Sequence, residues 1–177
     1  MGTVAIVDYG VGNLKSVANA LSYLGCSSCI TADPAELERA DAIILPGVGA
    51  FPDAADRLRS GGLDQHVLAQ GQKKPVLGIC LGMQLLLERS FEYGEHPGLG
   101  LIPGEVRPIR DVIPAGLAVP HMGWNALRFP AERPRSPIFA PLTAAVQRGN
   151  VYGTQFHPEK SGDVGLRILK AFCGLEG

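Results

Sequence analysis

The stretch VLGICLGMQLLLE at residues 76–88 decides the fold, because a strand, a turn and a helix follow one another within it. Val76 to Cys80 is a short apolar run typical of a strand buried on both faces, and Met83 to Glu88 is a helical stretch. Gly78 and Gly82 lie two positions either side of Cys80. Glycines at this spacing indicate a sharp strand-to-helix turn, in which neighbouring backbone approaches closely and the central side chain is exposed.

Two more buried strands are predicted earlier in the chain, each followed by a glycine-containing loop. Val4 to Val7 ends at Asp8, and the loop after it leads to Asn13, a good helix cap. Apolar residues then recur at helical spacing from Leu14 to Leu24. Ala42 to Leu45 is the second apolar run. This alternation of apolar strands and helices predicts an α/β fold with three αβα layers, in which a central, mostly parallel sheet is covered on both sides.

The second half of the chain is richer in proline and glycine than the first half. Pro and Gly punctuate residues 97–141, and the strand candidates are short: Ala118-Val119, Thr143 to Val146 and Val151 to Gln155. Such strands are more typical of a short antiparallel addition than of further crossovers. A last helix is predicted around Gly165 to Phe172. Because no internal repeat is visible, a single domain is expected.

The composition argues against several classes of function. The 177 residues are 46% apolar and 19% charged, which fits a soluble globular protein with a sizeable core. A net charge of −1 argues against nucleic acid as the main partner and against a polybasic membrane anchor. No apolar run approaches the roughly 20 residues that span a bilayer. The residues before Val4 show no basic stretch followed by an apolar segment, so secretion is not expected. Four cysteines do not make a disulfide framework, so a cytoplasmic location is expected.

Cys80 is the strongest candidate for a chemical role. Its sulfur is expected to lie over the N-terminus of the following helix, where the helix dipole favours the reactive thiolate. The alternative interpretation is a small buried cysteine at a strand end, which is common. The two flanking glycines and the strand-turn-helix context favour a nucleophile.

Phe156-His157-Pro158-Glu159 is the second candidate constellation. Pro158 biases His157 towards an extended backbone, in which residues two apart point the same way, so His157 and Glu159 are expected to share a face. Such a pair suits a general base and the carboxylate that fixes its tautomer. Taken alone, a surface histidine beside a solvated glutamate is the commoner outcome. Beside a nucleophilic cysteine, the catalytic interpretation is favoured.

Pro46-Gly47-Val48-Gly49 follows the second predicted strand, at the edge of the sheet where sites form in open α/β folds. Glycines allow backbone amides to turn towards a developing oxyanion, although the stretch taken alone indicates an ordinary turn. Two other patterns are rejected. Gly10-Val11-Gly12 lacks the third glycine of a dinucleotide fingerprint, and Cys26 and Cys29 lack a second pair of zinc ligands. No metal and no cofactor is therefore expected.

Together these patterns resemble the class I (triad-type) glutamine amidotransferases, which have a flavodoxin-like three-layer fold. Four stretches resemble one family within that class, the glutaminase subunits of imidazole glycerol phosphate synthase in histidine biosynthesis: PGVGAF at residues 46–51, GICLGMQ at 78–84, PHMGWN at 120–125 and FHPEKS at 156–161. DYGVGN at residues 8–13 is also similar. The resemblance runs from Val4 to Phe172.

The resemblance implies a glutaminase whose nucleophile is Cys80, with His157 as the general base and Glu159 holding the imidazole. L-Glutamine would be hydrolysed to glutamate and ammonia through a γ-glutamyl thioester on the cysteine. The oxyanion and the substrate glutamine would be bound by residues of the two glycine-containing turns and the following helix. These implied binding residues are Gly47, Val48, Gly49, Leu81 and Gln84.

The resemblance also implies a protein partner. Ammonia would pass to a (βα)8-barrel cyclase subunit in a heterodimer, which makes imidazole glycerol phosphate and aminoimidazole carboxamide ribotide. The residues implied at the surface that faces the barrel are Asn13, Met122, Trp124, Asn125 and Lys160. An alternative for Met122 and Trp124 is the ordinary core, because periodicity does not separate the two locations.

The chain departs from that family between residues 126 and 154. Members usually carry an aromatic segment with the sequence HSY there, which is absent here, and the join falls near Ala140-Pro141. We therefore expect a single amidotransferase domain over residues 1–177 that is shortened near 126–154. Two alternatives stay open. One is another class I glutaminase subunit, against which the stretches at 46–51 and 120–125 speak, and the other is an inactive binding module of the same fold.

Overall fold

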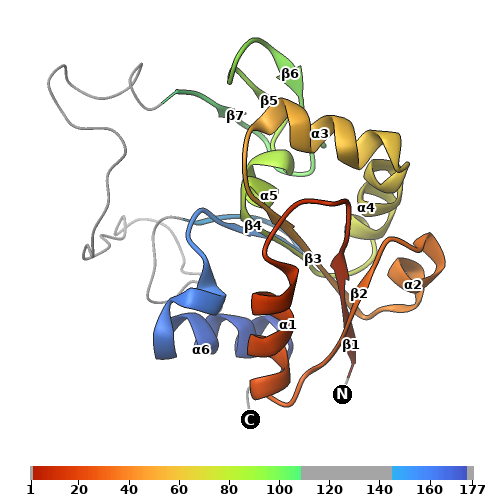
Figure 1. Ribbon diagram of the computed structural model, residues 1–177, viewed down its shortest axis with the longest axis vertical. Coiled ribbons are helices and arrows are strands. Elements are labelled where there is room, and N and C mark those ends of the chain that lie inside the picture. The colour runs from red at the N-terminus through yellow and green to blue at the C-terminus, as the bar shows by residue number, and fades with distance from the viewer. Residues whose placement is uncertain (1, 109–144, 175–177) are drawn as a thin grey trace, which may run out of the picture.

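A computed structural model describes residues 2–108 and 145–174, and its central element is a six-stranded sheet (Figure 1). The strand order is β2-β1-β3-β4-β9-β8. Within this sheet β8 pairs antiparallel to β9, and the other neighbours are parallel, which confirms the expected mostly parallel α/β sheet. The strands are β1 (Thr3–Val7), β2 (Ser27–Thr31), β3 (Ala42–Gly47), β4 (Val76–Cys80), β8 (Ala145–Arg148) and β9 (Val151–Thr154).

Helices cover both faces of this sheet and give the expected three layers (Figure 1). One face is covered by α1 (Leu14–Tyr23) and α6 (Gly162–Phe172). The other face is covered by α2 (Pro34–Arg39), α3 (Phe51–Ser60), α4 (Leu63–Gly71) and α5 (Leu81–Leu85). Strand β1 contributes side chains to the hydrophobic cores on both faces of the sheet, because successive side chains of a strand point to opposite faces. Val4 and Ile6 pack with α1 and α6, and Ala5 and Val7 pack on the opposite face.

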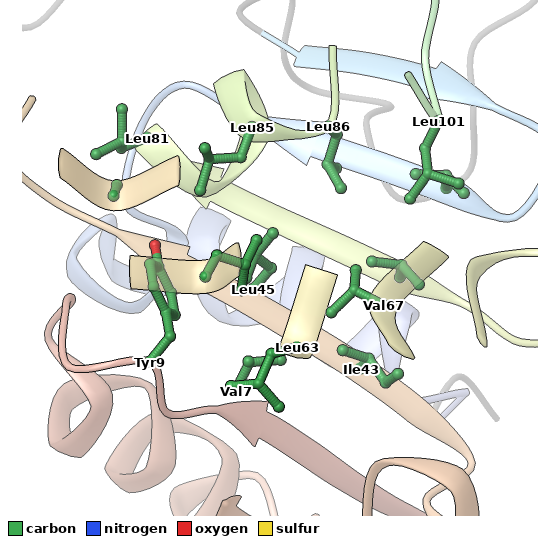
Figure 2. Close-up of a cluster of buried hydrophobic side chains, with 14 of the residues drawn as sticks. Val7, Tyr9, Ile43, Leu45, Leu63, Val67, Leu81, Leu85, Leu86 and Leu101 are labelled. Atoms are coloured by element: carbon green, nitrogen blue, oxygen red, sulfur yellow. The ribbon is translucent and has the colours of Figure 1, made fainter. Parts of the chain in front are cut away.

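The core on the second face supports the carboxyl edge of the sheet. Figure 2 shows leucine and valine side chains of the strands and helices packed against one another, with Tyr9 at the end of the cluster. Leu45, Val67 and Leu85 are at most 1% exposed. Each such side chain contributes roughly 1.5–3 kcal/mol relative to an exposed one. The ends of β3 and β4, where the predicted site residues lie, are therefore held in place by this buried hydrophobic core.

Strand β9 corrects one expectation. The sequence predicts residues 151–155 in the antiparallel addition, but β9 pairs parallel to β4, with Ile79 opposite Thr154. The antiparallel part of this sheet is β8, which forms a hairpin with β9. The sequence pattern of a short strand is similar in either direction, so the direction depends on the partner strand. Helix α5 also begins earlier than expected, at Leu81.

A second, smaller sheet follows α5 (Figure 1). It has the order β6-β5-β7 and consists of β5 (Arg89–Ser90), β6 (His96–Pro97) and β7 (Glu105–Val106). A 3₁₀ helix, η3 (Pro158–Lys160), follows β9 and packs against α1 and α6. The predicted strand at Ala118-Val119 and the join near Ala140-Pro141 lie outside the described residues. Across residues 2–108 and 145–174, no helix is long and apolar enough to cross a membrane.

Candidate active site

Cys80 is the last residue of β4 and directly precedes α5. Its φ of 56° and ψ of −115° lie in a region that residues other than glycine rarely adopt, so the backbone is strained at this turn. Gly78 and Gly82 make the turn possible. A Cβ atom at Gly78 would lie 2.7 Å from the Gly82 carbonyl oxygen, and a Cβ atom at Gly82 would overlap the Leu45 carbonyl oxygen. The two glycines therefore have the steric role that their spacing predicts.

The loop after β3 lies beside the cysteine because of the sheet register. Gly47 is opposite Cys80 in the β3–β4 pair. A Cβ atom at Gly47 would lie 2.6 Å from the backbone nitrogen of Gly82, so the two turns meet through glycines. Gly49 has a φ of 94°, which favours glycine, and the neighbouring Val48 side chain is exposed. The predicted oxyanion residues of both turns are thus brought together at one edge of the sheet.

Tyr9 holds the loop after β3 through a hydrogen bond, a role that sequence reasoning missed. Its hydroxyl donates a hydrogen bond to the Pro46 carbonyl oxygen at 2.7 Å. Burial, followed by the nearby charge of Cys80, raises the pKa of the Tyr9 hydroxyl far above its usual range. The hydroxyl therefore stays protonated and remains a donor to the loop. Tyr9 lies in the DYGVGN stretch, but nothing local in that stretch indicates a partner 37 residues away.

His157 and Glu159 are brought together, although not for the predicted reason. His157 is extended (φ −94°, ψ 100°) as expected before a proline, but the chain then turns into η3, so Glu159 is not in an extended segment. The His157 Nδ1 and Glu159 Oε1 atoms are 2.8 Å apart, and the Glu159 side chain is only 1% exposed. The second carboxylate oxygen, Oε2, is buried without a hydrogen-bond partner in the described structure. The imidazole is therefore the polar group that holds this carboxylate.

Cys80 and His157 form a coupled pair. A hydrogen bond with His157 is the main cause that lowers the pKa of the Cys80 thiol, and burial opposes it. The hydrogen bonds to Cys80 and then to Glu159 raise the pKa of His157 to about 9. Cys80 is a thiolate at pH values above its lowered pKa, and His157 is an imidazolium at pH values below its pKa of about 9. The two shifts therefore favour a thiolate–imidazolium pair, which is the reactive form of a cysteine nucleophile.

A cavity of about 590 Å³ opens beside the sulfur. Of the predicted residues, Gly49, Cys80, Leu81 and Gln84 line it. Sequence reasoning missed the opposite wall, which comes from the segment around the small sheet: Glu92, Tyr93, Val106, Arg107 and Pro108. Glu92 also accepts a hydrogen bond from the Phe51 backbone N–H at 2.8 Å and so ties this wall to the end of the loop after β3. No sequence pattern marks these residues, because only the tertiary structure brings them opposite Cys80.

Two glutamine side chains connect the cavity to the sulfur. Gln84 Nε2 donates to Gln155 Oε1 at 3.0 Å, and Gln155 Nε2 donates to the Cys80 Sγ atom at 3.6 Å. Gln84 belongs to the predicted set, whereas the sequence pattern marks Gln155 only as the end of a strand. Its position directly before Phe156-His157 was the signal that could have drawn attention to it.

The residues expected to face a partner are only partly described. Asn13 caps α1, with its Oδ1 atom accepting from the Ser16 backbone N–H at 3.4 Å. Lys160 is exposed at the end of η3, which packs against α1. Met122, Trp124 and Asn125 lie outside the described residues. In residues 2–108 and 145–174, no group of three or more His, Cys, Asp or Glu side chains could hold a metal ion.

Comparison with known proteins identifies relatives of similar extent. The profile of the family "Glutamine amidotransferase class-I" matches residues 5–128. "Imidazole glycerol phosphate synthase subunit HisH" of Lacticaseibacillus casei (strain BL23) is 46% identical over 197 aligned positions, which cover 96% of this chain and 94% of that protein. The protein of the same name from Bacillus thuringiensis (strain Al Hakam) is 41% identical over 201 positions, covering 97% and 94%. Both alignments are longer than this chain of 177 residues, so each relative has residues without a counterpart here.

A solved structure supports the same assignment at the level of the fold. The structure titled "Crystal structure of glutamine amidotransferase" matches with a TM-score of 0.69 at 21% identity, covering 96% of this chain and 98% of that one. The family match covers β3, β4 and α5, from which the nucleophile turn and the loop after β3 are built. The chain belongs to the class I glutamine amidotransferases, and within them to the family of HisH subunits of imidazole glycerol phosphate synthase.

Proposed function

We propose that this chain is the glutaminase subunit of an imidazole glycerol phosphate synthase. It hydrolyses L-glutamine to glutamate and ammonia, and it delivers the ammonia to a (βα)8-barrel cyclase subunit that makes imidazole glycerol phosphate and aminoimidazole carboxamide ribotide in histidine biosynthesis. The observation that carries the proposal is that Cys80 lines a cavity of about 590 Å³ and shares a hydrogen bond with His157, whose Nδ1 atom is 2.8 Å from Glu159 Oε1. The sequences of the HisH relatives support the same reaction.

The mechanism begins with attack of the Cys80 thiolate on the side-chain amide carbon of glutamine. His157, already protonated in the pair, gives its proton to the departing ammonia, and Glu159 stabilises the imidazolium until then. A γ-glutamyl thioester remains on the sulfur. The now neutral His157 takes a proton from water, which hydrolyses this thioester to glutamate and releases the Cys80 thiolate, so the thiolate and the protonated imidazole are both restored.

The tetrahedral oxyanion is stabilised by backbone amides from both turns. The Leu81 N–H is at the first turn of α5 and already interacts with the sulfur. A second donor comes from Val48 or Gly49 once the loop reorients, which the positive φ at Gly49 and the open space around it make possible. Gly47 brings the loop within reach, and Gln84 positions the substrate from the cavity wall.

The barrel subunit binds at the carboxyl edge of the sheet. This proposal places Asn13, Met122, Trp124, Asn125 and Lys160 in the interface. Asn13 and Lys160 lie on the α1 and η3 segments that pack together, which supports a common surface. A single amidotransferase domain, shortened near 126–154, and a cytoplasmic location complete the proposal. The described thiols are free, which agrees with a reducing compartment.

The proposal is tested by glutamate release from glutamine, measured with and without a cognate barrel cyclase and its ribotide ligand. Release that requires Cys80 and increases with partner and ligand is expected. Cys80→Ala should abolish release while keeping partner binding, and Cys29→Ala on the edge strand β2 serves as the matched cysteine control. Release by the parent that Cys80→Ala does not reduce refutes the mechanism. A folded parent chain without release under any condition indicates an inactive binding module, and release stimulated by a different synthase partner indicates another class I glutaminase.

A further inference from the structure

Gln155 contacts the nucleophile directly, and the mechanism above gives it no role. Its Nε2 atom donates to the Cys80 sulfur at 3.6 Å, and its Oε1 atom accepts from Gln84 Nε2 at 3.0 Å. A thiolate can only accept hydrogen bonds, so it requires the amide nitrogen of Gln155 to face it. The oxygen of the same carboxamide must then point away, and Gln84 is the donor that it meets. The two contacts therefore fix one orientation of the Gln155 side chain.

We propose that Gln155 is a further hydrogen-bond donor to the Cys80 thiolate beside His157 and the Leu81 N–H, that Gln84 anchors it, and that the two glutamines restrain the nucleophile until glutamine binds. The inference deepens the proposed function and rests on it for the identity of the substrate. Gln84 lines the cavity, whereas Gln155 follows β9. A substrate that takes the hydrogen bond of Gln84 removes the anchor from Gln155. The hydrogen bond to the sulfur then weakens as the substrate arrives.

The physical effect of this donor has two parts. A hydrogen bond to an anion favours the charged form, so Gln155 assists His157 in keeping the sulfur ionised. The same bond stabilises the lone pairs that attack, and thiolate nucleophilicity falls as the thiol pKa falls. The titratable groups that face Cys80 in the described structure are His157, Glu159 and Tyr9, with Glu92, Tyr93 and Arg107 across the cavity.

The test is the rate at which iodoacetamide alkylates Cys80 between pH 5 and 9, read from the Cys80 peptide by mass spectrometry. The full chain is used without partner and without glutamine. Gln155→Leu removes the donor, and Gln155→Glu keeps the shape but offers only acceptors. We expect the midpoint of the thiolate titration to rise by at most about one pH unit in Gln155→Leu, because a hydrogen bond to a charged group is worth about that much and the Gln155 side chain is exposed to solvent. The midpoint should rise further in Gln155→Glu, whose negative charge also opposes the thiolate. The plateau rate of Gln155→Leu at high pH should rise by up to about threefold.

Two further variants test whether the shift depends on the Gln84–Gln155 hydrogen bond and not on the loss of any glutamine side chain. Gln84→Leu leaves the donor in place but removes its anchor, so it should shift the midpoint in the same direction by a smaller amount. Gln147→Leu, an exposed glutamine on β8 whose amide donates to the Gly149 carbonyl oxygen, should leave midpoint and plateau unchanged. An unchanged midpoint in both Gln155 variants overturns the inference. Alkylation needs no glutamine turnover, so absence of glutamate release in the parent chain refutes the proposed function separately.

Discussion

Replacing Glu159 by glutamine should narrow the pH range over which Cys80 and His157 carry opposite charges. The pKa of His157 is raised to about 9, so the imidazolium is present below that pH and is lost as the pH rises through it. The hydrogen bond to Cys80 is the largest cause of this rise, and the hydrogen bond to Glu159 is the next. Glu159→Gln keeps the shape of the side chain and removes its charge, so the upper limit of the range should move to lower pH.

The structure sets the size of this effect. The His157 Nδ1 and Glu159 Oε1 atoms are 2.8 Å apart, and the carboxylate side chain is 1% exposed. A hydrogen bond to a charged group contributes roughly 1.5–3 kcal/mol, and one pH unit corresponds to about 1.36 kcal/mol. The smaller value applies, because the His157 side chain is 27% exposed to screening solvent and its contact with Cys80 remains. The upper limit should therefore fall by about one pH unit.

The assay is glutamate release across pH 6 to 10 with the barrel partner present, combined with an NMR titration of the His157 ring. Glu38→Gln, on an exposed position of α2, is the control and should leave both profiles unchanged. The carboxamide oxygen of the variant can still accept a hydrogen bond from His157 Nδ1, and its folding is checked by circular dichroism. A His157 pKa and an upper limit that stay near 9 in a folded Glu159→Gln protein would refute the argument.

Two other substitutions test the turns that carry the site. Gly82→Ala should lower the free energy of unfolding by about 1–3 kcal/mol or more, because the new Cβ atom overlaps the Leu45 carbonyl oxygen. Gly61→Ala is its control in urea unfolding, since the nearest atom to that Cβ would be 3.6 Å away, and equal stability of the two variants would contradict the steric argument. Tyr9→Phe should cost about 1–3 kcal/mol, because the Pro46 carbonyl oxygen loses its buried donor, and it should lower kcat for glutamine by loosening the loop. Tyr23→Phe, at a residue 79% exposed, should change neither value, and wild-type behaviour of Tyr9→Phe would show that the hydrogen bond does not hold the loop.

Local patterns predict a large part of this molecule. The apolar runs that became β1, β3 and β4 are short and uninterrupted, and a buried parallel strand requires such a run whatever its neighbours are. Gly78 and Gly82 likewise follow from the turn itself, because a side chain at either position would collide with backbone a few residues away or in the adjoining strand. His157 is extended because of Pro158, a restriction that acts between neighbours.

The direction of β9 and the far wall of the cavity were not predictable in this way. A four-residue strand carries no mark of which partner it will pair with, so β9 was expected in the antiparallel addition. Glu92 and Arg107 are separated from Cys80 by strands and turns that have no recognisable motif. They reach the site because the small sheet follows α5, and the packing of that helix on β3 and β4 decides where the sheet lies.

By itself the sequence determined the alternation of strands and helices, the nucleophile turn, and the residues from which a cysteine–histidine–glutamate triad can be built. These are properties of neighbouring residues, set by backbone sterics and by the side-chain types present. Only the tertiary structure decided that Gly47 lies opposite Cys80, that Glu159 reaches His157 through a 3₁₀ turn, and that Gln84 and Gln155 form a bridge to the sulfur. Each of these depends on how distant segments pack, and the free energy of that packing is shared among many contacts that no short stretch of sequence contains.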